Sequence, residues 1–213
     1  MMQLDYTTIN ERAFDFLADR YARRKNELNN LDPLVEMFFQ YILANFSNPS
    51  VLEMGVGSGD MLKYFSECFK TTAIDISSKM IEVAKRKAPS TAYLHSDFLK
   101  YDFSDKKFSG VFSGSVLHLF PREQIDKVLD KIYSILEEQG AFYLSVPLFN
   151  EFKEEIIKRG GDNFVLEYRI RYTEEKFNKV LTSSRLNLME KSVTKFMDSQ
   201  RNTLSKLNML LVK

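Results

Sequence analysis

Three glycines at alternate positions, Gly55, Gly57 and Gly59, follow directly on the apolar run 51–54. Glycine adopts positive φ angles easily, and because it has no Cβ a ligand can lie against its backbone. The run predicts a buried strand and the residues after Gly59 recur with helical spacing, so strand, glycine turn and helix together indicate a ligand-binding unit. A dinucleotide fingerprint needs glycine at position 60, where the chain has Asp60, and a carboxylate there would repel a diphosphate. A glycine turn that holds no ligand is the alternative interpretation.

Two carboxylates follow the next two predicted strands. Asp75 lies near the end of the apolar run 72–76, twenty residues after Gly55, which is the separation expected for a carboxylate that accepts ribose hydroxyls. Asp97 follows the predicted strand 92–95. A carboxylate at the end of a buried strand needs a polar partner, so we expect Asp75 to contact a ligand. An aspartate such as Asp97 can instead cap its own turn.

Four stretches of the chain resemble motifs of the class I S-adenosylmethionine (SAM) methyltransferases. Residues 53–59 carry E-x-G-x-G-x-G, which resembles the first motif of that family. The run 75–80 resembles the second motif, D-x-S-x-x-M, and 96–98 resembles the third. The segment 14–21 resembles the D-x-x-A-x-x-Y leader of many small-molecule members. The resemblance extends over about 10–213, is specific only from 51 to about 146, and implies SAM as the cofactor.

The resemblance also implies a role for each candidate cofactor residue. Asp75 would accept both ribose hydroxyls, which one carboxylate can do. Ile76 and Met80 would bracket the adenine, although a methionine at helical spacing usually packs in the core. Asp97 would accept from the adenine amino group, and the backbone N–H of Phe98 would meet a ring nitrogen. The predicted cofactor-binding residues are Glu53, Gly55, Gly57, Gly59, Asp75, Ile76, Met80, Asp97, Phe98 and Ser113.

His118 and Tyr21 are the candidate catalytic residues. His118 lies in the stretch 116–120, which resembles the L-x-H-x segment after the fourth strand of small-molecule members. Its ordinary pKa is close to neutral pH, so it can act as a general base if the nucleophile holds a proton; a hydrogen bond near the substrate mouth is the alternative. In the family, the leader tyrosine covers cofactor and substrate, which here implies Tyr21, with simple packing as the alternative. Residues near family substrate contacts are Tyr168, Arg169, Arg171 and Tyr172.

We expect an α/β fold with a doubly wound, Rossmann-like sheet. The resemblance implies seven mostly parallel strands with a C-terminal antiparallel hairpin. Apolar runs between helical patterns are typical of such a sheet. A polar turn around 198–202 is expected to join the last two strands. The predicted strands are 51–54, 72–76, 92–95, 108–115, 141–146, 186–196 and 204–213.

The chain is long enough for one domain with a sizeable core. Residues 1–46 are expected to form a helical N-terminal leader or cap, and 47–213 the SAM-binding methyltransferase domain. A helix from 121 to about 136 is expected to precede a turn that ends at Gly140. The segment 147–172 is charged and long for a connection, which makes it a candidate lid.

The composition limits the expected partners. Thirty Lys and Arg against twenty-nine Asp and Glu leave a formal net charge of +1, which argues against a large nucleic-acid footprint. The single cysteine, Cys68, excludes an internal disulfide and a cysteine metal cluster, and no metal site is predicted. We expect Cys68 to pack inside the helix after the glycine loop. Without a signal peptide or a long apolar run, a cytoplasmic protein with no membrane partner is expected, as a monomer or homodimer that binds a small-molecule substrate.

The expected activity is in-line transfer of a methyl group from SAM to an oxygen, nitrogen or carbon nucleophile of a small molecule. Residues 113–118 do not carry N-P-P-Y, the motif of members that modify planar amino groups, and no Pro-Cys nucleophile is present. A small acid, amine, hydroxyl or natural-product scaffold therefore remains. The alternatives are a non-catalytic SAM-binding regulatory or partner subunit, a tRNA wobble-uridine side-chain methyltransferase, and a nicotinamide oxidoreductase, which Asp60 disfavours.

Overall fold

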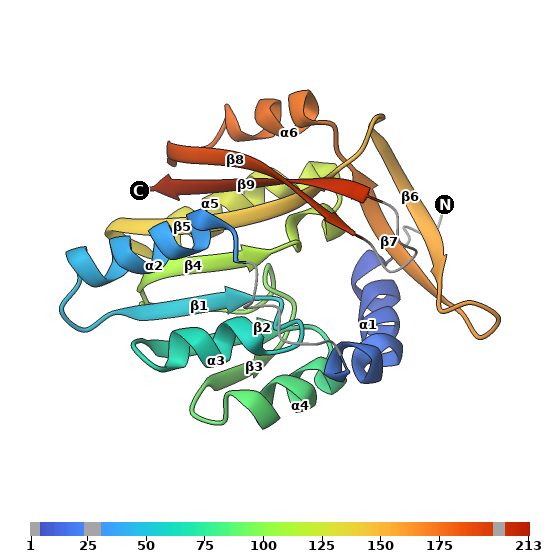
Figure 1. Cartoon of the computed structure of the whole chain (residues 1–213), viewed down its shortest axis with the longest axis horizontal. Helices are drawn as coiled ribbons and strands as arrows, with labels where there is room; N and C mark the ends of the chain where they lie inside the picture. The colour runs from blue at the N-terminus through green and yellow to red at the C-terminus, as the bar shows by residue number, and fades with distance from the viewer. Residues whose placement is uncertain (1–4, 24–30, 198–202) are drawn as a thin grey trace.

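A seven-stranded sheet with the order β3-β2-β1-β4-β5-β9-β8 forms the centre of the molecule, shown by a computed structural model (Figure 1). The structure describes residues 5–23, 31–197 and 203–213. Strands β1 to β5 run parallel, and β9 lies antiparallel between β5 and β8. This confirms the predicted fold class; the turn expected around 198–202 lies outside the described residues. The strands are β1 Ser50–Met54, β2 Lys70–Asp75, β3 Ala92–His95, β4 Phe108–Gly114, β5 Leu136–Leu148, β8 Asn187–Met197 and β9 Thr203–Val212.

Helices cover both faces of this sheet. Asp32 caps α2 by accepting the backbone N–H of Leu34 at 2.8 Å, with Pro33 at the first helical position, where its missing N–H is not needed. No described helix has the length and apolar character needed to cross a membrane. The helices are α1 Tyr6–Ala22, α2 Pro33–Asn45, α3 Asp60–Ser66, α4 Ser78–Lys87, α5 Ile125–Ile135 and α6 Glu174–Leu181, with 3₁₀ turns η2 Leu117–Leu119 and η3 Arg122–Gln124.

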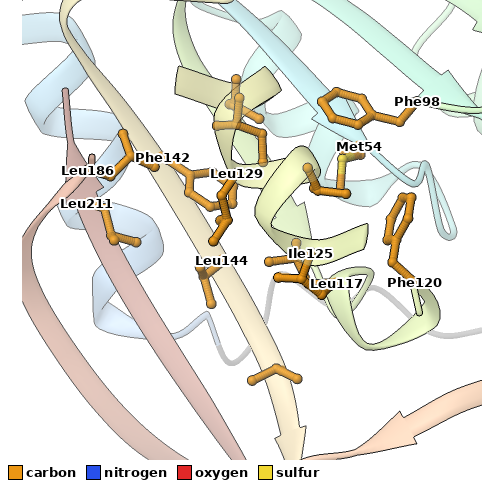
Figure 2. Packing of buried hydrophobic residues seen from close by; sticks show 14 of the residues in the cluster. Met54, Phe98, Leu117, Phe120, Ile125, Leu129, Phe142, Leu144, Leu186 and Leu211 are labelled. Atoms are coloured by element: carbon orange, nitrogen blue, oxygen red, sulfur yellow. The ribbon is translucent and has the colours of Figure 1, made fainter. Parts of the chain in front are cut away.

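The central parallel strands are buried on both faces, which is why they read as continuous apolar runs. Val51 of β1 belongs to a cluster formed with α2 and α3, whereas its neighbour Leu52 belongs to a second cluster formed with α5 and α6. Figure 2 shows part of the second cluster, where Leu129 lies beside Phe142 of β5 and Ile125 lies beside Leu117. The alternation of side chains along each strand therefore supplies the two cores.

The end of the helix that precedes β5 is confirmed to within one residue, but two other local predictions are wrong: the turn that ends at Gly140 and the packing of Cys68. The helix expected to reach about Leu136 ends at Ile135, and β5 begins at once, because Leu136 is fully buried and pairs with Phe108 of β4. The turn expected at Gly140 is a register shift inside this pairing, with Gln139 at a φ of +61°. Cys68 lies beyond the end of α3 and is exposed, so it is not packed inside a helix.

The segment 147–172 contains a β-hairpin that the sequence did not indicate. Its strands β6, Lys153–Arg159, and β7, Val165–Arg171, form a separate two-stranded sheet. Gly160 and Gly161 turn the chain with φ angles of +112° and +76°. Figure 1 shows this hairpin and α1 side by side, across the edge toward which β1 and β4 point. Its action as a lid stays a prediction.

The packing of α2 generates a stability prediction. Phe38 is fully buried, with its ring 5.8 Å from that of Phe65 and 6.0 Å from that of Phe112. We expect Phe38→Ala to lower the free energy of unfolding by about 3–5 kcal/mol, because it empties the centre of an aromatic cluster. The neighbouring Met37 is 40% exposed, so Met37→Ala should change stability by only about 0.5 kcal/mol. Urea unfolding of both variants measures the difference, and equal losses would contradict this packing.

Candidate functional site

A cavity of about 1340 Å³ opens at the carboxyl ends of the parallel strands. Its walls come from the loops after β1, β2, β3 and β4, from α1, and from the β6–β7 hairpin. Ligands of open α/β sheets bind at this edge, where the loops converge. All the predicted cofactor-binding residues except Ser113 line the cavity, and so do both candidate catalytic residues, His118 and Tyr21.

The three glycines of the loop after β1 are needed for different reasons. Each has positive φ: +80° at Gly55, +49° at Gly57 and +79° at Gly59. A Cβ at Gly55 would lie 2.5 Å from Cγ2 of Val116, and a Cβ at Gly59 would lie 2.7 Å from Cα of Ala84. A Cβ at Gly57 would have no described atom within 4 Å. Packing therefore requires Gly55 and Gly59, whereas Gly57 leaves open space along the cavity.

The carboxylate of Asp75 holds two loops together. One oxygen accepts the backbone N–H of Val56 in the glycine loop at 2.9 Å, and the other accepts that of Ser77 at 2.8 Å. Protein atoms surround the carboxylate, and this desolvation raises the pKa of Asp75 to about 6 although the two hydrogen bonds lower it. Each oxygen keeps a further lone pair, so Asp75 can still accept hydroxyls from a ligand.

Asp97 combines both roles considered for it. One carboxylate oxygen accepts the backbone N–H of Leu99 at 2.8 Å, which is the turn-capping arrangement, and the other accepts the Thr7 hydroxyl of α1 at 3.0 Å. The residue also lines the cavity beside Phe98. Met80 lines it as well while being only 2% exposed, so packing and ligand contact are compatible at this position.

The prediction for Ser113 is not supported by its position. Its side chain is fully buried within β4, and its hydroxyl has no hydrogen-bond partner in the part of the chain that the structure describes. Ser115, two residues on, lines the cavity with a φ of +60°. Its backbone N–H donates to the carbonyl of Ser145 at 3.0 Å and to the Ser145 hydroxyl at 3.1 Å. The cavity edge therefore lies beyond Ser113, at the last residue of β4, Gly114, and at Ser115.

Asp60 is part of a buried ion pair. Its carboxylate contacts Lys87 Nζ of α4 at 2.7 Å and accepts the Ser58 hydroxyl at 2.8 Å, and the residue is 6% exposed. Lys87 therefore compensates the charge that was expected to repel a diphosphate. The argument against a dinucleotide rests on the absent glycine at position 60 and no longer on charge.

His118 lies on η2 and faces an electropositive surrounding. Its Nδ1 is buried without a hydrogen-bond partner among the described residues. Burial, with smaller contributions from the guanidinium groups of Arg169 and Arg159, lowers the pKa of His118 to about 3. The imidazole is therefore neutral at pH 7. Tyr21 lies on α1, edge-on to Phe14 with ring centroids 6.4 Å apart.

Helix α1 supplies positioning residues that sequence reasoning missed. Asn10, 1% exposed, donates to the carbonyl of Leu119 at 3.3 Å and accepts the backbone N–H of Tyr168 at 2.8 Å, so it joins η2 to β7. Asp15 accepts the Ser77 hydroxyl at 2.6 Å at the start of α4. Asp15 is the first residue of the leader pattern, so the sequence could have indicated its role. The sequence gives no such indication for Asn10, because only the fold shows that Asn10 is buried.

The four residues expected near the substrate fall into two groups, one that lines the cavity and one that is buried in the core. Arg169 and Arg171 line the cavity. Tyr168 and Tyr172 are 7% and 0% exposed and belong to the core. Side chains alternate along a strand, so Arg169 and Arg171 share one face of β7, while Tyr168 shares the other face with the buried Ile170.

Part of the chain that includes the glycine loop and Asp75 is similar in sequence to known proteins. Residues 51–140 match the family model described as a methyltransferase domain. Over 122 residues the chain is 32% identical to the carboxy-S-adenosyl-L-methionine synthase of Nautilia profundicola, covering 53% of this chain and 51% of that protein. The chain spans about half the length of several curated relatives that it matches.

Two solved structures share the fold. A SAM-dependent methyltransferase of Methanosarcina mazei superposes with a TM-score of 0.73 at 16% identity, covering 86% of this chain and 98% of that one. The 1,6-didemethyltoxoflavin-N1-methyltransferase of Burkholderia thailandensis, solved with its substrate and S-adenosylhomocysteine, gives 0.66 at 17% identity and covers 98% and 85%. At these identities the similarity establishes the fold.

The glycine geometry generates a paired prediction. Alanine at either Gly57 or Gly59 carries the roughly 1–2 kcal/mol cost of a left-handed backbone. Gly59→Ala also collides with the α4 backbone, so it should lose about 1–3 kcal/mol more stability. Gly57→Ala should instead weaken binding of the predicted cofactor by roughly tenfold or more, because its methyl enters space along the cavity. Thermal unfolding and SAM titration of both variants measure this; equal stability losses would contradict it.

The buried imidazole generates a pH prediction. His118 has a pKa of about 3 in the folded chain and about 6.5 when unfolded. Between these values the unfolded state binds more protons, so acidification from pH 6.5 toward 3 lowers the free energy of unfolding. His118→Gln removes this contribution, and urea unfolding from pH 7 to 4.5 should show a shallower decline in the variant. Asp75 opposes the decline in both proteins alike, since its raised pKa stabilises the fold as pH falls through 6. Parallel declines would contradict the assignment.

Proposed function

We propose that this chain, a member of the class I SAM-dependent methyltransferases, transfers a methyl group from SAM to an oxygen, nitrogen or carbon nucleophile of a small molecule. The observation that carries the proposal is the joining of the glycine loop and the β2–α4 turn by Asp75. The methyltransferase domain match over 51–140 spans both segments. Because the matches cover only about half of several relatives, the acceptor is argued from this chain's own residues.

The cavity suits SAM in size and in polar groups. Its volume of about 1340 Å³ falls above the range of small-molecule sites, about 300–1,000 Å³, which leaves room for an acceptor beside the cofactor. Gly57 provides the open wall and Asp75 the remaining acceptor capacity for a ribose diol. Glu53 lines the same wall at the end of β1 and suits the cationic methionyl end.

The chain's own residues bind, orient and exclude water. When bound, SAM supplies an electrophilic methyl carbon, and that reactivity belongs to the cofactor. Holding an acceptor in line with it can contribute roughly 7–11 kcal/mol to the reaction. The residues placed to do so are those of α1, η2 and the hairpin, which border the cavity opposite the glycine loop. Tyr21 of α1 closes over the cavity in this proposal.

His118 orients the acceptor in this proposal and is not a strong base in the resting protein. A pKa of about 3 leaves the imidazole neutral but weakly basic. A neutral ring can still hydrogen-bond an acceptor at its cavity-facing side. Deprotonation is needed only if the nucleophile holds a proton at neutral pH.

A second candidate is chemistry on SAM itself. The 32% identity with a carboxy-S-adenosyl-L-methionine synthase favours it, as does 25% identity over 177 residues with the enzyme of that name from Campylobacter jejuni, covering 72% of each chain. Mass spectrometry of SAM after incubation with the protein and small carboxylic acids separates the two. A carboxylated SAM product would favour the second candidate, whereas S-adenosylhomocysteine with a methylated acceptor would favour the first.

Titration with SAM tests the cofactor site. A lost hydrogen bond to a charged group costs about 1.5–3 kcal/mol, so Asp75→Asn should weaken SAM binding by roughly ten- to a hundredfold. In the wild type, affinity should also fall as pH drops through about 6, where Asp75 takes up a proton and can no longer accept both hydroxyls. The variant should lack that decline.

Asp102→Asn is the matched control for this titration. Asp102 also accepts a backbone N–H, from Ser104 at 2.7 Å, but is exposed and lies outside the cavity. It should bind SAM as the wild type does. Unchanged affinity in Asp75→Asn, or a pH dependence that survives the substitution, would refute the ribose contact.

A further inference from the structure

The charged residues that line the cavity are distributed unequally between its two sides. The acids Glu53, Asp75 and Asp97 stand at the ends of β1, β2 and β3. The opposite wall is the β6–β7 hairpin, which contributes one acid, Glu167, and several cations. These are Lys158, Arg159, Arg169 and Arg171. A cationic cofactor end suits the first side, so the second side must accommodate something else.

Two of these cations share a single carboxylate. Oε1 of Glu155 accepts Arg169 at 3.0 Å from Nη2 and 3.1 Å from Nε, and it also accepts Nε of Arg171 at 2.7 Å. Glu155 is 10% exposed in its side chain, so this is a largely buried contact. Arg171 reaches a second carboxylate, Glu151, only at 3.8 Å, and that side chain is 69% exposed. An exposed pair at this distance contributes little, so the Arg169–Arg171 pair keeps about one uncompensated positive charge.

The remaining two hairpin cations differ from this pair. Arg159 lies 3.4 Å from Glu167, whose carboxylate is buried, so these two charges balance. The ammonium of Lys158 lies 4.2 Å above the ring of Phe164, which attracts it without neutralising its charge. The excess charge of the hairpin therefore lies at Lys158 and at the Arg169–Arg171 pair, and only the pair converges on one carboxylate.

Both guanidinium groups also flank one aromatic ring. The ring centroid of Phe149 lies 5.4 Å from Cζ of Arg169 and 5.3 Å from Cζ of Arg171. Phe149 lines the cavity with them. Each guanidinium has five N–H donors, and Glu155 uses only part of them. Side-chain exposures of 17% and 31% leave donors reachable but only partly hydrated, which suits a planar anion bound by two groups.

We propose that the methyl acceptor carries an anionic group, a carboxylate or a phosphate, which binds Arg169 and Arg171 while an apolar part of the molecule lies on Phe149. This inference rests on the proposed function, since it assigns the acid-lined side to SAM and the hairpin side to the acceptor. His118 borders the same space. The anion offsets the guanidinium charge that the imidazole faces, so acceptor binding makes His118 more basic.

Matched charged and neutral probes test the anion site. Benzoate and benzamide have nearly the same shape but differ in charge. With the protein saturated in S-adenosylhomocysteine, calorimetry should show saturable benzoate binding and at least roughly tenfold weaker benzamide binding. Phenyl phosphate replaces benzoate in a third titration: tighter binding than benzoate identifies a phosphate acceptor, and weaker binding identifies a carboxylate acceptor.

Two arginine variants test where benzoate binds. Arg171→Gln leaves Arg169 on Glu155, so the fold is retained, and it should weaken benzoate binding by roughly tenfold while S-adenosylhomocysteine affinity stays unchanged. Arg185→Gln is the matched control, because Arg185 also pairs with a carboxylate, Asp130, and lies over a ring, Tyr133, but outside the cavity. It should bind both ligands as the wild type does.

The outcomes separate this inference from the proposed function. Equal binding of benzoate and benzamide, or full benzoate binding by Arg171→Gln, overturns the anion site even if S-adenosylhomocysteine binds. If benzoate is excluded because the cofactor's own carboxylate occupies the arginines, Arg171→Gln loses S-adenosylhomocysteine affinity, which also overturns it. If S-adenosylhomocysteine fails to bind, the proposed function fails, and the same probe pair on the ligand-free protein still decides the anion site.

Discussion

The carboxylate of Asp75 is the contact on which the site depends. It receives backbone N–H groups from Val56 and Ser77, so the glycine loop and the start of α4 keep one relative position. Gly59 can approach Ala84 of α4 closely only while that position holds. The raised pKa of Asp75 is the cost of placing an acid among protein atoms, and the same desolvation strengthens any hydrogen bond it accepts.

Helix α1 connects the two sides of the cavity through hydrogen bonds. Asp15 bonds to Ser77 beside the cofactor side, and Asn10 bonds to both η2 and β7. One helix therefore sets the distance between the acid-lined wall and the hairpin. A buried amide that satisfies two separate segments is costly to replace, because either segment would then keep an unpaired polar group.

Most of the fold, and the presence of the predicted carboxylates at one cavity, were predictable because their signals are local. The spacing from Gly55 to Asp75, together with alternating strands and helices, predicts the sheet and the carboxylates that converge on its edge. The start of β5 at Leu136 was not predictable, because pairing with β4 extends the strand through residues that were expected to form a turn. Ser113 was expected to line the cavity and does not, because its side chain is buried within β4 and the next two residues line the cavity instead. The sequence did not indicate the hairpin 153–171, because the contacts that stabilise it are the pairing of β6 with β7 and a hydrogen bond to α1.

The hairpin forms its own sheet, outside the hydrogen-bonded order that carries Asp75 and the glycine loop. Under the proposals made above, the arginines that bind the acceptor therefore lie in a different stretch of the chain from the residues that hold the cofactor. Substitutions in 153–171 would then change which compound is selected and leave the nucleoside site intact. Such a separation would allow the acceptor preference to change while cofactor binding is retained.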